Sequence, residues 1–162
     1  MLKAYDSWPE ISKDAFTRNY EPVHFSGITH IVIVGMGGSG ALGDIFTSIM
    51  SKTKVHVSVV KGYLLPKTVD KNTLVITISI SGNTVETLTA LKEAKNLDCN
   101  TIAFSSGGKM EKICLEENIH YRKILFVHSP RTSLVSFFFS ILKILNSVIP
   151  TEEKDVYETI NE

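Results

Sequence analysis

The chain has 162 residues, and its 17 lysines and arginines balance 17 aspartates and glutamates, so its formal net charge is zero. This length is typical of one ordinary domain, and the neutral charge excludes bulk electrostatics as an argument for binding nucleic acid or a membrane surface. Hydrophobic residues make up 43% and charged residues 21%, a balance that excludes an intrinsically disordered chain.

The first residues lack the apolar core of a signal peptide. The most apolar stretch, residues 133–149, is shorter than a membrane span and contains Lys143 and Asn146. Cys99 and Cys114 match no metal-ligand spacing and are too few for a disulfide framework, so we interpret them as small core residues in a reducing compartment. We therefore expect a cytoplasmic protein with no metal and with no nucleic-acid or membrane partner.

Apolar runs alternate with amphipathic stretches along the chain. A short helix is predicted first, over residues 9–18, with Pro9 in its first turn and Ser7 as a candidate cap. Strands rich in β-branched residues are predicted over residues 29–35, 55–60, 74–79, 100–104 and 121–127. Further helices are predicted over residues 38–50, 83–96, 109–118 and 130–148. We expect residues 1–150 to form a single domain, followed by a polar helical tail or truncated linker over residues 151–162.

Strands that alternate with helices predict a parallel sheet with helices on both faces. Five strands predict a three-layer α/β/α domain whose five-stranded parallel sheet has the flavodoxin-like order 2-1-3-4-5, with right-handed crossovers. In such a sheet, ligands bind beyond the carboxyl ends of the strands, near the switch point between the first and third strands.

Four loops at that predicted edge share one composition, because they consist mainly of glycine and hydroxyl residues and include one arginine. They are GMGGSG (35–40) after the first strand, SISGNT (79–84) after the third, SSGG (105–108) after the fourth and HSPR (128–131) after the fifth. Loops that merely connect elements need no such uniformity, so we interpret this edge as a ligand site.

The SISGNT loop predicts a phosphate site. It lies where a strand turns into a helix, so free backbone N–H groups and the positive end of the helix dipole point at the crevice. Ser79, Ser81 and Thr84 add hydroxyl donors, and Gly82 lets the backbone approach a ligand closely. The alternative is that Ser81 or Asn83 simply caps the helix. Capping needs one such residue and the loop offers several, so we favour a dianion site built from neutral donors.

The GMGGSG loop also matches the dinucleotide-binding fingerprint, with Gly35, Gly37 and Gly40 in the glycine positions. That fold expects an acidic residue at the end of the second strand for the ribose. The sequence has Lys61 there, followed by Gly62. A cation could suit a 2′-phosphate, but the serine cluster of the third strand has no role in that scheme, so dinucleotide binding ranks second.

Together, GMGGSG followed by ALGD, SISGNTVET, SSGG and Pro130-Arg131 resemble the sugar isomerase (SIS) domain, and the resemblance covers the whole chain. Within that superfamily the pattern is similar to the N-terminal half of the bifunctional phosphoglucose/phosphomannose isomerases of archaea and some bacteria. Those aldose–ketose isomerases interconvert fructose 6-phosphate with glucose 6-phosphate or mannose 6-phosphate, and they use no metal or organic cofactor.

The resemblance also implies roles for particular residues. Ser79, Ser81 and Thr84 would hold the phosphate, and Gly38 and Ser39 would contact the sugar. Arg131 would be catalytic and lie near the reacting carbons. A permanently charged guanidinium suits stabilisation of the oxyanion that develops in a cis-enediolate.

The related enzymes place their proton-transfer glutamate and ring-opening histidine in a second SIS domain, and no residue of this chain matches either. We therefore expect an isomerase half that is completed by a second SIS-domain chain or by a homodimer partner, or a fragment of a longer isomerase. The alternative is a non-catalytic sugar-phosphate-binding regulatory module. Within the chain, Glu86 and His128 are the local candidates for proton transfer. The run Phe137 to Phe139 cannot share one helix face, so its helix is expected to be part core and part interface.

Overall fold

The computed structural model describes residues 5–161, and the chain divides into two compact units. One unit is continuous, from Phe25 to Ile124, and contains the sheet. The other takes its residues from both ends of the chain, up to His24 and from Leu125 onwards. That residues 1–150 form a single domain stays a prediction.

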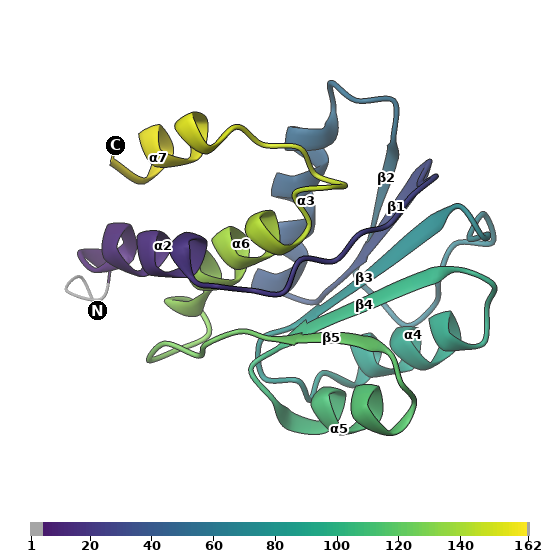
Figure 1. Ribbon diagram of the computed structural model, residues 1–162. Helices are drawn as coiled ribbons and strands as arrows, with labels where there is room; N and C mark the ends of the chain where they lie inside the picture. Colours follow the sequence, from purple (N-terminus) through teal and green to yellow (C-terminus); the bar gives the residue numbers. More distant parts are fainter. Residues whose placement is uncertain (1–4, 162) are drawn as a thin grey trace. The chain divides into compact units, whose positions relative to one another are not determined.

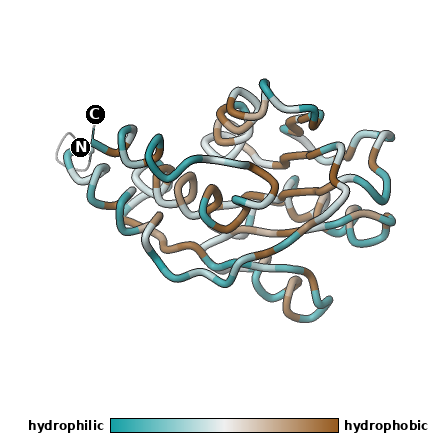
Figure 2. Tube along the Cα trace, turned by 45° about the horizontal axis from the view of Figure 1, so that its top comes forward, coloured by the Kyte–Doolittle hydropathy of each residue, from teal (hydrophilic) through white to brown (hydrophobic). Residues whose placement is uncertain are grey.

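The sheet has five parallel strands in the order β2-β1-β3-β4-β5, which confirms the predicted fold class and strand order (Figure 1). Every residue of the central strands β1 and β3 is buried, whereas the edge strands β2 and β5 are partly exposed. Burial on both faces explains why the central strands are apolar throughout. Figure 2 shows hydrophobic residues along the strands and hydrophilic residues in the connecting loops. The strands are β1 (His30–Val34), β2 (His56–Val60), β3 (Thr73–Ser79), β4 (Asn100–Ser105) and β5 (His120–Lys123).

Helices cover both faces of this sheet. Helix α3 (Gly38–Met50) lies on one face, and α4 (Val85–Lys95) and α5 (Gly108–Glu116) lie on the other (Figure 1). Alternate strand residues face the two layers. Ile33 contacts the α3 side, where a Cβ on Gly43 would lie 2.8 Å from Val59 Cγ1, so a small residue lets α3 pack closely. On the other side, Val32, Val34 and Val75 pack with Ala90 and Ala94 of α4.

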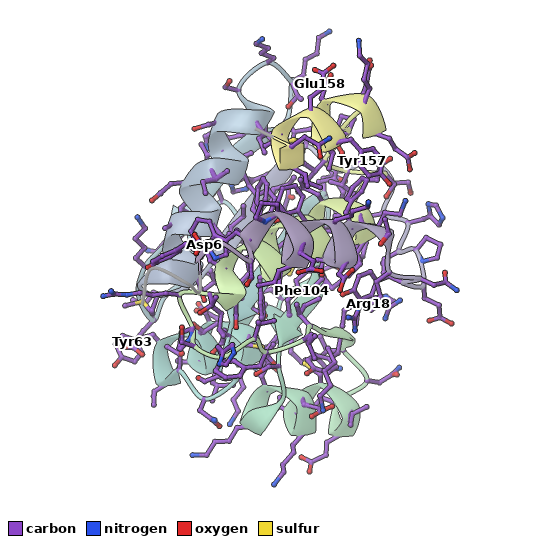
Figure 3. The ribbon with its side chains drawn as sticks, turned by 90° about the vertical axis from the view of Figure 1, so that its left-hand side faces the viewer. Asp6, Arg18, Tyr63, Phe104, Tyr157 and Glu158 are labelled. Carbon is purple, nitrogen blue, oxygen red and sulfur yellow. The ribbon has the colours of Figure 1, made fainter. Side chains whose placement is uncertain are left out.

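The connection from β2 to β3 contains no helix. It is held by Leu65, which is buried in the cluster beneath α4 and whose backbone N–H donates to Glu93 Oε2 at 3.1 Å. The residues before it are exposed, and Figure 3 shows the Tyr63 ring projecting outwards. At the other edge of the same unit, the Phe25 ring meets the His120 ring edge to face, with centroids 5.7 Å apart.

The second unit is helical. It contains α2 (Trp8–Thr17), α6 (Ser133–Ile144) and α7 (Glu153–Asn161), and α2 contacts both of the others. The Phe16 ring meets the Tyr157 ring edge to face at 5.8 Å, and Lys143 Nζ lies 4.9 Å from the Phe16 ring centroid. The polar tail predicted over residues 151–162 thus forms a helix over residues 153–161 with two buried side chains, Val156 and Ile160. Residue 162 lies outside the described residues.

Three predicted details are wrong. The fifth strand ends at Lys123, not at residue 127, because its partner β4 ends at Ser105, the residue paired with Lys123. Further along, the Ser133 hydroxyl bonds both the N–H and the carbonyl of Val127. The helix predicted from residue 130 begins at Ser133, after a turn in which Ser129 Oγ accepts the Thr132 N–H. Ser7 occupies the N-cap position of α2, but its hydroxyl makes no cap bond.

Two histidines form a small network at the amino ends of the strands. His30 of β1 lies beside His56 of β2, and their Nε2 atoms lie 2.9 and 3.3 Å from the Ser58 hydroxyl oxygen. Burial lowers the pKa of His30 below its ordinary value, and His56 lowers it further, while Asp70 acts in the opposite direction. The folded chain therefore resists a proton that the unfolded chain accepts.

Stability is accordingly expected to fall as the pH drops below about 6.5, the ordinary histidine pKa, by at most about 1.4 kcal/mol per pH unit from this residue. Urea unfolding of the wild type and of His30→Gln between about pH 8 and pH 5 measures this effect. The variant should show the shallower pH dependence. Equal dependence in the two proteins would contradict the assignment to His30.

Candidate functional site

The candidate site lies where the carboxyl ends of β1 and β3 meet. The two strands are paired up to Val34 and Thr77, so the loops that follow them start side by side. One loop leads into α3 on one face of the sheet and the other into α4 on the opposite face (Figure 1). This divergence is the switch point at which doubly wound sheets open a crevice.

The loop after β1 brings the first turn of α3 close to the strand end. A Cβ on Gly40 would lie 2.8 Å from the Gly35 carbonyl oxygen, so only glycine permits this approach. Gly38 is exposed, and Ser39 is buried to 6% exposure. Within the described chain, the Ser39 hydroxyl makes no hydrogen bond, which leaves it available to a ligand.

The loop after β3 gathers three hydroxyl groups. Ser79 Oγ lies 3.0 Å from Thr84 Oγ1 and accepts the Gly82 N–H at 3.1 Å. Ser81 is exposed, and its hydroxyl oxygen accepts the Asn83 N–H at 3.2 Å. All three hydroxyls have a fixed place in the loop. Because Ser79 and Thr84 share one hydrogen bond, Ser81 and one of these two can still donate to an added acceptor.

The helix that follows this loop is uncapped. Thr84 is the N-cap residue of α4 and makes no side-chain cap bond. Among residues 5–161, no acceptor meets the backbone N–H groups of Val85, Glu86 or Thr87. The alternative that Ser81 or Asn83 caps this helix is therefore wrong, because both side chains are bonded elsewhere. Free N–H groups at the positive end of a helix dipole suit an anion.

The carbonyl groups of the same loop are occupied. The Ile80 carbonyl accepts the Ser106 N–H at 3.0 Å and the Ser106 hydroxyl at 2.6 Å. The Gly82 carbonyl accepts the Met110 N–H at 2.9 Å. Because these oxygens are turned toward Ser106 and α5, donors rather than acceptors remain for a ligand.

The SSGG loop, which the sequence assigns to the ligand site, supports the loop after β3, since Ser106 bonds the Ile80 carbonyl. The Ser105 hydroxyl donates to the Gly107 carbonyl at 2.8 Å and lies 3.0 Å from the Tyr121 hydroxyl oxygen. Burial raises the pKa of Tyr121, so this phenol stays protonated and can keep its hydrogen bond. Sequence reasoning missed this supporting role. The paired glycines at 107 and 108, both with positive φ, are the signal for it.

Lys61, the cation that a dinucleotide phosphate would need, is already paired. Its Nζ lies 2.7 Å from Asp44 Oδ2 of α3. Among the described residues, no group of three or more histidine, cysteine or acidic side chains is placed to hold a metal ion. In the same part of the chain, no helix is both long and apolar enough to cross a membrane.

Arg131 and His128 belong to the other unit. Both are exposed in the turn before α6, and His128 has a φ of 55°. The Ser133 hydroxyl, which contacts the Val127 and Ser129 carbonyls at 3.1 and 2.9 Å, holds this turn. The structure thus gathers Gly38, Ser39, Ser79, Ser81 and Thr84 at one edge of the sheet unit. The position of Arg131 beside a substrate stays a prediction.

Comparison with known proteins identifies relatives of the chain. The SIS domain family matches residues 24–148. The bifunctional phosphoglucose/phosphomannose isomerase of Caldicellulosiruptor bescii is 33% identical over 98% of the chain, which covers 45% of that protein. The enzyme of the same name from Aquifex aeolicus is 35% identical over 96% of the chain and 46% of its own length. The chain thus spans about half the length of these curated relatives.

A solved structure shares the fold. The C-terminal domain of glucosamine-fructose-6-phosphate aminotransferase from Francisella tularensis superposes with a TM-score of 0.67 at 20% identity, covering 99% of this chain and 51% of that one. This likeness shows the arrangement of the sheet and helices, and at this identity it shows no more.

Gly82 offers a direct test of the loop contact. Gly82 and Gly27 share a φ of 69°. A Cβ on Gly82 would lie 1.8 Å from the Gly107 carbonyl oxygen, whereas a Cβ on Gly27 would point into open space. Gly82→Ala should therefore lower the free energy of unfolding by about 1 to 3 kcal/mol more than Gly27→Ala. Urea unfolding of both variants measures the difference, and equal losses would contradict the close contact.

Proposed function

The chain belongs to the SIS domain family, and from that membership we propose that it binds a phosphosugar at the loops after β1 and β3. The phosphate would lie against the first turn of α4 and the hydroxyls of Ser79, Ser81 and Thr84. The sugar would extend toward Gly38 and Ser39. This pose joins the uncapped helix end to the free hydroxyl of the neighbouring loop.

The observation that carries the proposal is the uncapped start of α4. A helix N-terminus inside a protein normally finds a capping acceptor. Here the first-turn N–H groups have no such acceptor in the described chain, while the nearby carbonyls are bonded to Ser106 and to α5. A phosphate dianion would accept these hydrogen bonds and gain from the helix dipole.

The reaction that we propose is aldose–ketose isomerisation of fructose 6-phosphate to glucose 6-phosphate or mannose 6-phosphate, as the names of the relatives suggest. The proton moves between C1 and C2 through an enediolate, which needs a carboxylate base and a cation near the oxyanion. Arg131 would supply the cation. Binding of the distant phosphate would provide energy for positioning. None of these steps calls for a metal or organic cofactor.

A second SIS domain would complete the active site in this proposal. It would come from a twin subunit, another chain or a further part of a longer protein, and would supply the base and the ring-opening histidine. The same anion site would also serve a non-catalytic sugar-phosphate-binding regulatory module. Binding alone therefore does not decide between these functions, and turnover does.

The phosphate role of Ser81 is testable by binding. Ser81→Ala should weaken the binding of fructose 6-phosphate by about 1 to 3 kcal/mol, because the charged phosphate would lose one hydrogen bond. Ser48→Ala is the matched control, since Ser48 is also exposed and its hydroxyl bonds the Asp44 carbonyl of its own helix. Isothermal titration of the three proteins gives the affinities. An unchanged affinity in Ser81→Ala would remove Ser81 from the site.

Turnover is testable by proton NMR of fructose 6-phosphate in heavy water. Deuterium entry at C1 or C2, or new aldose phosphate signals, is the expected result for the isomerase. Arg131→Ala should then keep binding nearly intact and abolish exchange. If Arg131→Ala lost binding as well as exchange, Arg131 would instead be a phosphate ligand.

The same spectra separate the remaining outcomes. Line broadening without exchange would favour the regulatory module or a missing second domain, and adding a second SIS domain would distinguish these two. The absence of both line broadening and exchange would contradict phosphosugar binding by this chain.

A further inference from the structure

Asn83 joins the loop after β3 to the start of α5. Its side-chain Nδ2 donates to the Ser81 carbonyl at 3.1 Å, and its Oδ1 accepts the Lys109 N–H at 3.1 Å. Its own backbone N–H donates to the Ser81 hydroxyl oxygen at 3.2 Å. One residue therefore contacts both oxygens of Ser81 and the first turn of the neighbouring helix.

The Asn83 amide is also confined. A Cβ on Gly108, the first residue of α5, would lie 2.6 Å from the Ser81 carbonyl oxygen and 2.9 and 3.0 Å from the two amide atoms of Asn83. The amide and the Ser81 carbonyl thus pack directly on the α5 backbone. Although Asn83 is exposed to solvent, its side chain cannot rotate without breaking both bonds.

We infer that Asn83 is a positioning residue of the anion site, which acts by fixing Ser81. It keeps the Ser81 carbonyl turned away from the crevice and keeps the Ser81 hydroxyl available to an anion. The inference rests on the proposed function and deepens it. Without the Nδ2 donor, the Ser81 carbonyl would lack its partner. If that carbonyl rotated toward the ligand, its negative oxygen would lie beside the phosphate and weaken binding.

Simple capping of α5 is the competing role, because Oδ1 accepts a first-turn N–H of that helix. Two substitutions separate the roles. Aspartate keeps the acceptor and suits a helix N-terminus, but it cannot donate to the Ser81 carbonyl. Alanine removes both bonds. A residue needed only as a cap would therefore tolerate aspartate, and a residue that positions Ser81 would not.

The experiment measures affinity for inorganic phosphate and for fructose 6-phosphate by isothermal titration, with urea unfolding of each protein alongside. Asn83→Asp and Asn83→Ala should each bind both ligands about three- to tenfold more weakly, the factor expected from one hydrogen bond. Asn83→Asp should unfold close to the wild type, because its charge at the start of α5 offsets the lost Nδ2 bond. Asn96→Asp adds the same charge at the C-cap of α4 and should bind like the wild type.

Charge repulsion is separated from positioning by salt. Repeating the titrations at about 1 M salt, where the Debye length is about 3 Å, should leave the loss in Asn83→Asp in place. A loss that vanishes with salt, or wild-type affinity in Asn83→Asp, would overturn the inference. Wild-type affinity in Asn83→Ala would do the same. If the wild type itself bound neither ligand, the proposed function would fail, and the inference with it. If the wild type bound both ligands and the Asn83 variants bound them equally well, the inference alone would fail.

Discussion

The contact between Gly82 and the Gly107 carbonyl is the constraint on which the candidate site depends. There is no room for a side chain between them, since a Cβ on Gly82 would lie 1.8 Å from that oxygen. This approach sets the loop after β3 directly on the start of α5, where N–H groups of Ser106, Lys109 and Met110 can reach it. The shape of the loop is therefore determined by a neighbouring helix as well as by its own residues.

Two helices begin at this edge and are used differently. The N–H groups at the start of α5 bond the loop, whereas those of the first turn of α4 have no acceptor in the described residues. Each helix start carries a partial positive charge of about half an electron. One of these charges holds protein carbonyls in place, and the other has no acceptor among the described residues. Rigid carbonyls on one side and unmet donors on the other are what the proposed anion site would use in place of a lysine.

The sequence predicted the fold well, because the β-branched runs and their burial determine the strands and the strand order. It placed the fifth strand's end wrongly, since β5 stops where its partner β4 ends at Ser105, and the length of a partner strand leaves no mark on the periodicity of residues 121–127. The hydroxyls of Ser79, Ser81 and Thr84 were found from composition. The inward use of Ser105 and the bridge made by Asn83 were not, because composition tells which groups can bond and not the direction in which they point.

The edge contact of Phe25 with His120 has a consequence for the order of folding. In the helical unit, Tyr20 bonds Ser140 across a sequence separation of 120 residues. Once the sheet unit has formed, Phe25 and His120 are neighbours. The loop that the Tyr20–Ser140 bond closes is then effectively about 25 residues long, which lowers the entropy cost of closing it by roughly 1 to 2 kcal/mol. Closing the helical unit therefore costs less chain entropy once the sheet unit has formed. The turn that carries Arg131 lies in the unit whose closure becomes less costly in this way.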